Sequence, residues 1–153
     1  MSHNYGDHPG QDDHIINQAL AILECRQRHL GQAFTHPNAA ADFLRLKMGE
    51  YEREVFAVML LDNQHRLLDY QELFFGTINA GSVYPREVVK AVLGKNAAAV
   101  ILAHNHPSGM AEPSDADKAI TARLQEVLEV VDVQVLDHFV VGQHDAVSFA
   151  ERG

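Results

Sequence analysis

Apolar positions recur along the chain with two periods, and the alternation between these periods predicts helices and strands in turn. Residues 13–31 and 37–49 repeat apolar side chains about every 3.6 positions, which indicates two helices that each pack one face against a core. Residues 55–61 and 97–103 are continuous apolar runs, which are typical of strands buried on both faces. The remaining elements are expected as a strand over 66–75, a helix over 85–93, a helix over 114–130, a strand over 133–141 and a short edge strand over 146–149.

This order of elements defines the expected fold class. Strands and helices alternate, and the polar stretch 62–65 predicts a hairpin between two of the strands. We therefore expect an α/β protein in which helices pack on a mixed sheet. Residues 1–12 are polar and acidic and are expected to form a disordered leader. One domain is expected over 13–153, with amino-terminal helices in 13–48 and a core in 50–149.

The composition narrows the classes of protein that the chain can represent. A length of 153 residues suits a single domain with a core of its own. Cys25 is the only cysteine, which excludes an internal disulfide and a cysteine-rich zinc module, so any zinc site must use histidine and carboxylate ligands. No segment resembles a signal peptide or has the apolar length of a transmembrane helix, so we expect a cytoplasmic protein with no membrane partner.

The charge balance argues against nucleic acid as a partner of this chain alone. The formal net charge is −9 with histidine neutral, and the lysine and arginine residues are scattered along the sequence. Proteins that bind nucleic acid usually present a basic face, because neutralising phosphates supplies much of the affinity. We therefore expect no tight binding of nucleic acid.

The stretch from His104 to Asp117 carries the candidate chemistry. It follows an apolar strand, and His104 and His106 are two positions apart, so a strand would point both imidazoles to the same side. A Pro-Ser-Gly turn comes next, and Ser114 then begins a helix with Asp117 in its first turn, where the helix dipole keeps a carboxylate ionised. Two imidazoles and one carboxylate form a common catalytic zinc set that leaves the fourth tetrahedral position to water. The metal would lower the pKa of that water towards about 7.

Each part of this stretch also has a structural interpretation. Ser-x-x-Asp at the start of a helix is an ordinary capping box, and a single His-x-His pair is more often a surface or core feature than a metal site. The letters His-Asn-His are also the name of a nuclease motif, but the residues of that motif are spread over a hairpin and a helix. The zinc hypothesis depends on the combination, because strand, histidine pair, turn and acidic helix start follow in the order that a metal site requires.

The spacing His-x-His, seven residues, Ser, two residues, Asp resembles the JAMM (MPN-plus, Jab-type) metalloprotease signature, and residues 104–117 match it without a gap. A resemblance to the RadC family extends over roughly residues 38–149. It rests on the segments Arg53-Glu54-Val55-Phe56, Leu61-Asp62, Gly76-Thr77, Pro85-Arg86-Glu87, His104-Asn105-His106-Pro107-Ser108-Gly109 and Asp137-His138.

This resemblance implies a three-layer α/β/α sandwich with a mixed sheet, similar to the cytidine deaminases. It implies one Zn²⁺ per chain, bound by His104, His106 and Asp117. The family's glutamate that acts as general acid and base corresponds to Glu54, and the serine that stabilises the oxyanion corresponds to Ser114. The implied reaction is hydrolysis of an amide or isopeptide bond in a protein or peptide substrate by metal-activated water.

Several alternatives stay open at this point. Glu87 is the rival base, although its Pro-Arg-Glu context indicates a helix start. Asp137 and His138 are candidates for indirect support of the metal, with Asp137 orienting the imidazole.

Residues 13–48 lack the paired Gly-hydrophobic-Gly hairpins of full-length RadC proteins, so the chain resembles a short form without the helix-hairpin-helix region, and its association with DNA repair is weak. A non-catalytic or DNA-repair-associated accessory module is the second hypothesis, and a metal-dependent nuclease is the third.

Overall fold

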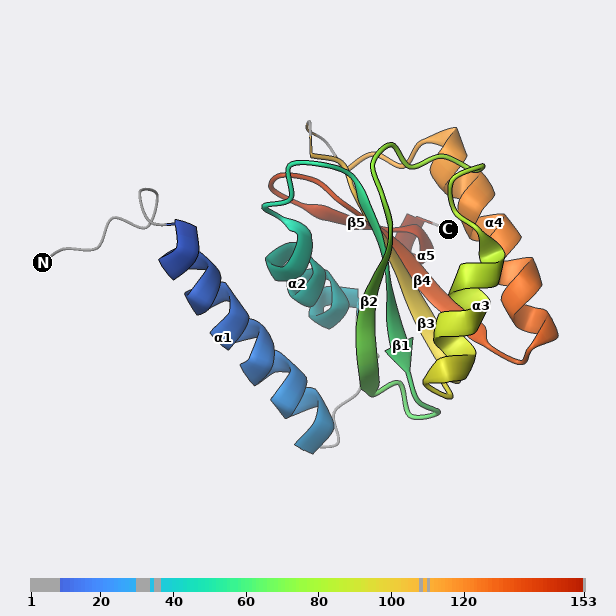
Figure 1. The fold of residues 1–153 in the computed structure, drawn as a ribbon, viewed down its shortest axis with the longest axis horizontal. Helices are drawn as coiled ribbons and strands as arrows, with labels where there is room; N and C mark the ends of the chain where they lie inside the picture. Colours follow the sequence, from blue (N-terminus) through green and yellow to red (C-terminus); the bar gives the residue numbers. More distant parts are fainter. Residues whose placement is uncertain (1–8, 30–33, 35–36, 108, 110, 153) are drawn as a thin grey trace, which may run out of the picture.

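A mixed sheet lies at the centre of the molecule, with helices on both of its faces (Figure 1). The computed structural model describes residues 9–29, 34, 37–107, 109 and 111–152. Within these residues the elements are α1 (Pro9–His29), α2 (Pro37–Met48), β1 (Val55–Leu61), β2 (Leu67–Phe75), α3 (Pro85–Gly94), β3 (Ala99–Asn105), α4 (Asp115–Val130), β4 (Gln134–Val141), β5 (Ala146–Ser148) and α5 (Phe149–Arg152). The sheet order is β2-β1-β3-β4-β5, in which β3 and β4 are parallel and the other neighbours are antiparallel.

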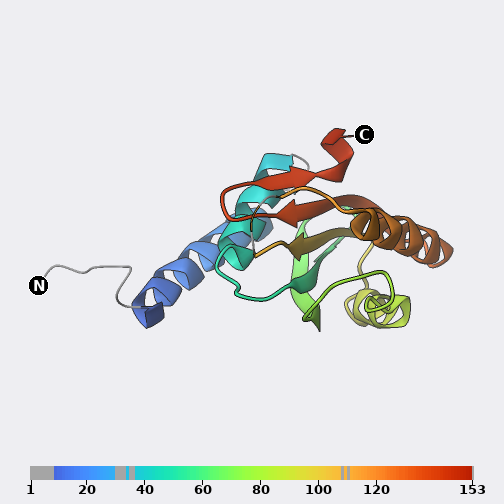
Figure 2. The same ribbon diagram turned by 90° about the horizontal axis from the view of Figure 1, so that it is seen from above.

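The sheet separates two hydrophobic clusters, because successive residues of a strand point to opposite faces. On β1, Val55, Ala57, Met59 and Leu61 join the side chains of α1 and α2, while the residues between them face α3 and α4. Figure 2 shows the same division from above, with α1 and α2 on one side of the sheet and α3 and α4 on the other. The expected α/β/α sandwich with a mixed sheet is confirmed.

The amino-terminal helices follow the predicted pattern with one correction. α1 begins at Pro9, inside the segment expected to be a disordered leader, because proline suits the first turn of a helix and Asp12 supplies an acidic side chain there. Residues 1–8 of the expected leader and residues 30–31 at the expected end of the helix lie outside the described residues. In α2, Phe43 and Leu44 of the apolar positions are completely buried, whereas Leu46 is 38% exposed.

The predicted hairpin forms, and one of its boundaries moves because a side chain holds the backbone in the turn. β1 occupies its predicted range, and all of its residues are buried. β2 begins at Leu67 and not at Arg66, because the carboxylate of Asp62 accepts hydrogen bonds from both the backbone and the guanidinium group of Arg66. His65 completes the turn with a positive φ of 62°.

β3 lies two residues further along the chain than its apolar run predicts. Its last two residues are polar, but they continue the parallel ladder with β4, where His104 pairs with Val140 and Asn105 with Val141. Backbone pairing, which a hydrophobicity pattern does not register, therefore extends the strand into the candidate motif. This extension is what places His104 on a buried strand.

The remaining elements agree with the predicted order. α3 and α4 form over their predicted ranges, and Ser114 is the N-cap of α4. β5 ends at Ser148 because Phe149 begins the short helix α5, which the sequence pattern did not indicate. Among the helices in the described part of the chain, none is both long and apolar enough to cross a membrane.

Candidate metal centre

The carboxyl end of β3 brings two histidines together. His104 is on the strand and is 2% exposed, and the backbone N–H of His106 donates to the carbonyl of Val141 at 2.8 Å. The two imidazole centroids are 4.7 Å apart, and the rings are nearly perpendicular. The imidazoles therefore lie on the same side of the chain, as their spacing predicts.

Asp117 reaches the same point from the first turn of α4. Ser114 holds this turn, since its hydroxyl accepts from the Asp117 N–H at 3.1 Å and its own N–H donates to Asp117 Oδ2 at 2.9 Å. Asp117 Oδ1 is 2.8 Å from Nδ1 of His104, and Oδ2 is 3.3 Å from Nε2 of His106. One carboxylate therefore contacts both imidazoles.

The pKa of the Asp117 carboxyl lies well below its usual range. Burial acts to raise this pKa, but the contacts with His104 and His106 and the hydrogen bond from the Ser114 backbone lower it by more. Asp117 is therefore an anion at neutral pH, although its side chain is almost completely buried.

Glu54 arrives at the site from a distant part of the sequence. It precedes β1, which pairs antiparallel with β3 so that Phe56 lies opposite His104. Glu54 Oε1 is 3.8 Å from Nε2 of His104, and Oε2 accepts a hydrogen bond from the N–H of Ile78 at 2.6 Å. Potential ligand atoms of Glu54, His104 and His106 all lie within 4.8 Å of one another, close enough to hold one metal ion.

The donor atoms of this cluster fit a zinc ion. Among the described residues, Nδ1 and Nε2 of His104 and Oδ1 of Asp117 are buried without a hydrogen-bond partner. Nδ1 and Oδ1 are close, but they are not aligned for a hydrogen bond with each other. Buried polar atoms are normally satisfied by a partner, and imidazole nitrogen and carboxylate oxygen are atoms that zinc accepts. The structure offers two such carboxylates beside the imidazoles, those of Asp117 and Glu54.

Ser114 and Glu87 differ in their relation to the cluster. Ser114 forms a complete capping box with Asp117, as its structural interpretation holds, but this cap uses the hydroxyl oxygen only as an acceptor. Glu87 lies in the first turn of α3, where its side chain is 48% exposed and Oε2 is 3.6 Å from Nζ of Lys90. The structure therefore brings Ser114 to the cluster and leaves Glu87 on a helix surface.

Asp137 does not orient the imidazole of His138, contrary to the expectation. Its carboxylate accepts instead from the backbone N–H of His138 and from the hydroxyl of Ser148, because neighbours on a strand point to opposite faces. The imidazole Nδ1 of His138 is hydrogen-bonded to the hydroxyl of Thr121, which also donates to the carbonyl of Asp117 at 2.9 Å. Sequence reasoning missed Thr121, whose only signal is its position four residues after Asp117 on the same helix.

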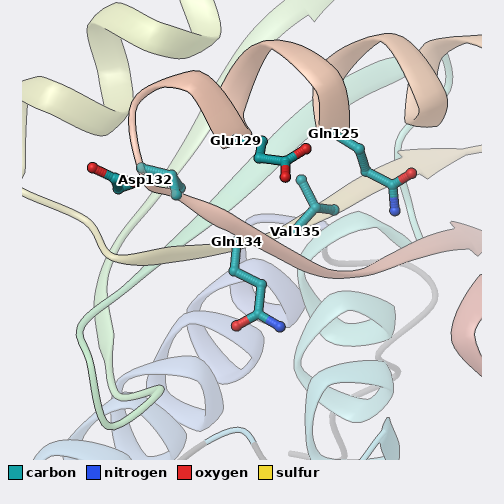
Figure 3. Close-up of a pocket in the computed structure, with 6 residues that line it drawn as sticks. Gln125, Glu129, Asp132, Gln134 and Val135 are labelled. Carbon is teal, nitrogen blue, oxygen red and sulfur yellow. The ribbon is translucent and has the colours of Figure 1, made fainter.

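A pocket of about 530 Å³ lies elsewhere on the molecule (Figure 3). Its lining includes Glu129 of α4, Asp132 in the following turn and Gln134 of β4. Gln134 pairs with Ala99, the first residue of β3, whereas His104 is close to the last. The pocket is therefore at the opposite end of the sheet from the candidate metal centre and takes no part in it.

Known proteins resemble this chain over most of its length. The family model described as the RadC-like JAB domain matches residues 34–153. A UPF0758 protein of Vibrio cholerae serotype O1 is 58% identical over 143 residues, which cover 94% of this chain and 90% of the relative. UPF0758 proteins of Idiomarina loihiensis and Methylibium petroleiphilum are 56% and 57% identical and cover 90% and 89% of this chain. The chain spans only 64% of the length of each of these two relatives.

An α/β/α sandwich that gathers two histidines and two carboxylates at the end of a central strand has the architecture of a JAB-type domain. The chain belongs to the RadC-like JAB domain family, because the family model covers residues 34–153 and the relatives are more than half identical. The resemblance to the RadC family is therefore confirmed.

Proposed function

We propose that this chain is a zinc-dependent hydrolase of amide bonds, acting on a peptide or on an isopeptide linkage in a protein. The observation that carries the proposal is that Glu54 and Asp117 both lie against the pair of imidazoles of His104 and His106. Within the described part of the chain, both ring nitrogens of His104 and Oδ1 of Asp117 are buried there without a hydrogen-bond partner. Membership of the RadC-like JAB domain family supports the same reaction class, because the JAMM resemblance implies metal-dependent amide hydrolysis.

The residues divide between holding the metal and moving the proton. His104, His106 and Asp117 would hold the ion, since the anionic carboxylate touches both imidazoles. Zinc, when bound, would polarise the scissile carbonyl and supply a nucleophilic water at neutral pH. Glu54 would take the proton of the attacking water at Oε1, the oxygen that faces His104, and pass it to the leaving amine. The N–H of Ile78 would keep Oε2 in place during both transfers.

Ser114 would assist at the carbonyl oxygen. Its hydroxyl oxygen accepts from the backbone of Asp117, so the hydroxyl proton is left to donate to the oxyanion that forms when water adds to the amide. One side chain would then both cap the helix that presents Asp117 and stabilise the transition state.

The test compares two glutamates in the same assay. Purified chain would be analysed for zinc, screened against a peptide library, and then remade as Glu54→Gln and as Glu87→Gln. Glutamine keeps the shape of glutamate without its basicity, so Glu54→Gln should keep zinc and Tm while hydrolysis falls by about 10²-fold or more. Glu87→Gln is the matched control, because this side chain is exposed on α3, and it should change little.

The outcomes distinguish the assignments. Activity that survives Glu54→Gln and disappears in Glu87→Gln would show that the wrong glutamate has been chosen. Activity unchanged in both variants would refute the proton-transfer mechanism. A zinc-loaded chain that cleaves no library peptide would favour the non-catalytic accessory module over the hydrolase.

A further inference from the structure

Asn105 separates the two histidines in the sequence, and its side chain makes contacts of its own. The residue is buried, with an exposed fraction of 2%. Its Oδ1 accepts a hydrogen bond from the N–H of Val55 at 2.6 Å, and its Nδ2 donates to the carbonyl of Arg53 at 3.0 Å. Val55 is the first residue of β1 and Arg53 lies just before the strand, so both partners are about fifty residues earlier in the chain.

These two hydrogen bonds enclose Glu54. The β1–β3 ladder reaches the pair Phe56 and His104, and beyond that pair the amide of Asn105 contacts the backbone on either side of Glu54. The Glu54 carbonyl accepts from the N–H of Gly76 at 3.0 Å, and its carboxylate accepts from Ile78. The main chain of Glu54 is therefore held from β3 and from the loop after β2.

We propose that Asn105 is a positioning residue that holds the carboxylate of Glu54 against the metal centre; this inference rests on the proposed function. The same strand end carries His104, so a rigid link between Asn105 and the backbone around Glu54 fixes the spacing between base and metal ligand. A displacement of about 1 Å between reacting groups can reduce a rate about 10²-fold, so such a link has a functional effect. A merely structural amide would satisfy two backbone groups and contribute only stability.

The experiment follows the visible absorption spectrum of the Co²⁺-loaded chain with pH, because this spectrum reports ionisation beside the metal without a substrate. A carboxylate near the metal opposes the loss of a proton there, so Glu54→Gln should lower the spectral midpoint by about one pH unit. Asn105→Ala should move the midpoint in the same direction by at least half as much, because the carboxylate is no longer held in place. The double variant should show no further shift, since both changes remove the same interaction.

Two further variants separate positioning from folding. Ser148→Ala is the matched control, because Ser148 is buried and donates to Asp137 on β4, while β3 and β4 separate its strand from β1. It should lower Tm and leave the midpoint unchanged. Asn105→Ser keeps a polar group that is too short to bridge both backbone partners, and it takes the place of Asn105→Ala if the alanine variant does not fold.

The outcomes for the inference and for the proposed function are distinct. If Glu54→Gln moves the midpoint while the folded Asn105 variant does not, the inference is overturned and the proposed function stands. An additive double variant would also overturn the inference, because it would show that Asn105 acts independently of Glu54. If the unaltered chain binds no Co²⁺, the proposed function and the inference both fail.

Discussion

Lowering the pH from about 7 to about 5 should destabilise the metal-free protein through His138. This residue on β4 is completely buried, with its ring stacked on Phe149 and edge-on to Phe56. The Thr121 hydroxyl donates to the Asp117 carbonyl, so it accepts from Nδ1–H of His138, and the remaining Nε2 is buried without a hydrogen-bond partner among the described residues. Protonation of His138 would therefore place an unpaired charge in the core.

The size of the effect follows from the pKa of this imidazole. Burial, reinforced by His104 and His106 and opposed by Asp117, lowers the pKa of His138 from 6.5 to about 3. Below about pH 6.5 the unfolded chain therefore binds a proton on His138 that the folded chain does not bind. The contribution of neutral His138 to the free energy of unfolding is fully present above that pH and is lost as the pH decreases. Each pH unit below about 6.5 lowers the free energy of unfolding by about 1.4 kcal/mol, so His138 should lower it by about 2 kcal/mol at about pH 5.

The measurement is urea unfolding with EDTA present at the two pH values. Far-ultraviolet circular dichroism is the suitable probe, because the chain contains no tryptophan. His138→Phe removes the ionisable group and keeps an aromatic ring against Phe149 and Phe56, while the Thr121 hydroxyl still donates to the Asp117 carbonyl. Over the same pH interval, the free energy of unfolding of this variant should fall by about 2 kcal/mol less than that of the unaltered chain. Equal losses in the two proteins would refute the reasoning.

Three other predictions concern the metal, the partner and the loop beside the site. The chain should bind about one zinc ion, and His104→Ala or Asp117→Ala should abolish binding measured by elemental analysis; full metal content in both variants would contradict the ligand assignment. Duplex DNA should bind weakly and with strong salt dependence, because the net charge is −9, and tight binding at physiological salt would contradict this. Gly142→Ala should lower the free energy of unfolding in urea by about 1–3 kcal/mol, because the added Cβ would lie 2.8 Å from backbone atoms of Gly109 and Ala111. An unchanged free energy of unfolding would show that the backbone of this loop moves to make room for the methyl group.

The fold was largely predictable because burial imposes a period on the sequence. Every position of β1 is buried, and a run of seven apolar residues is what such a strand requires. The errors fall where other interactions determine the boundary. Asp62 keeps Arg66 in the turn, and ladder pairing carries β3 onto Asn105. α1 already includes Pro9 and Asp12, which the hydrophobic period beginning at Asp13 does not include.

The site was predictable to the extent that its residues are close in the sequence. The spacing from His104 to Asp117 already contains the strand end, the turn and the capped helix start that bring these side chains together. The supporting contacts had no such signal. The interpretation of Asp137 and His138 as one unit was wrong because neighbours on a strand face opposite ways. Asn105 lies inside the recognised motif, but its hydrogen bonds to Arg53 and Val55 could not be predicted from it. These bonds form only because β1 pairs with β3.

Strand order explains how a motif contained in one segment acquires a carboxylate from about fifty residues away. β1 runs antiparallel to β3, so the start of β1 lies beside the end of β3, and Glu54 therefore reaches His104. The connection from β3 through α4 to the parallel β4 returns to the opposite end of the sheet, so the first turn of α4, with Asp117, is above the same strand end. If β2 stood between β1 and β3, Glu54 would be one strand spacing further away, about 4.8 Å, and could not face His104. The central pair β1–β3 is therefore the structural requirement of the site, and Asn105 is the side chain that extends this pairing to the backbone around Glu54.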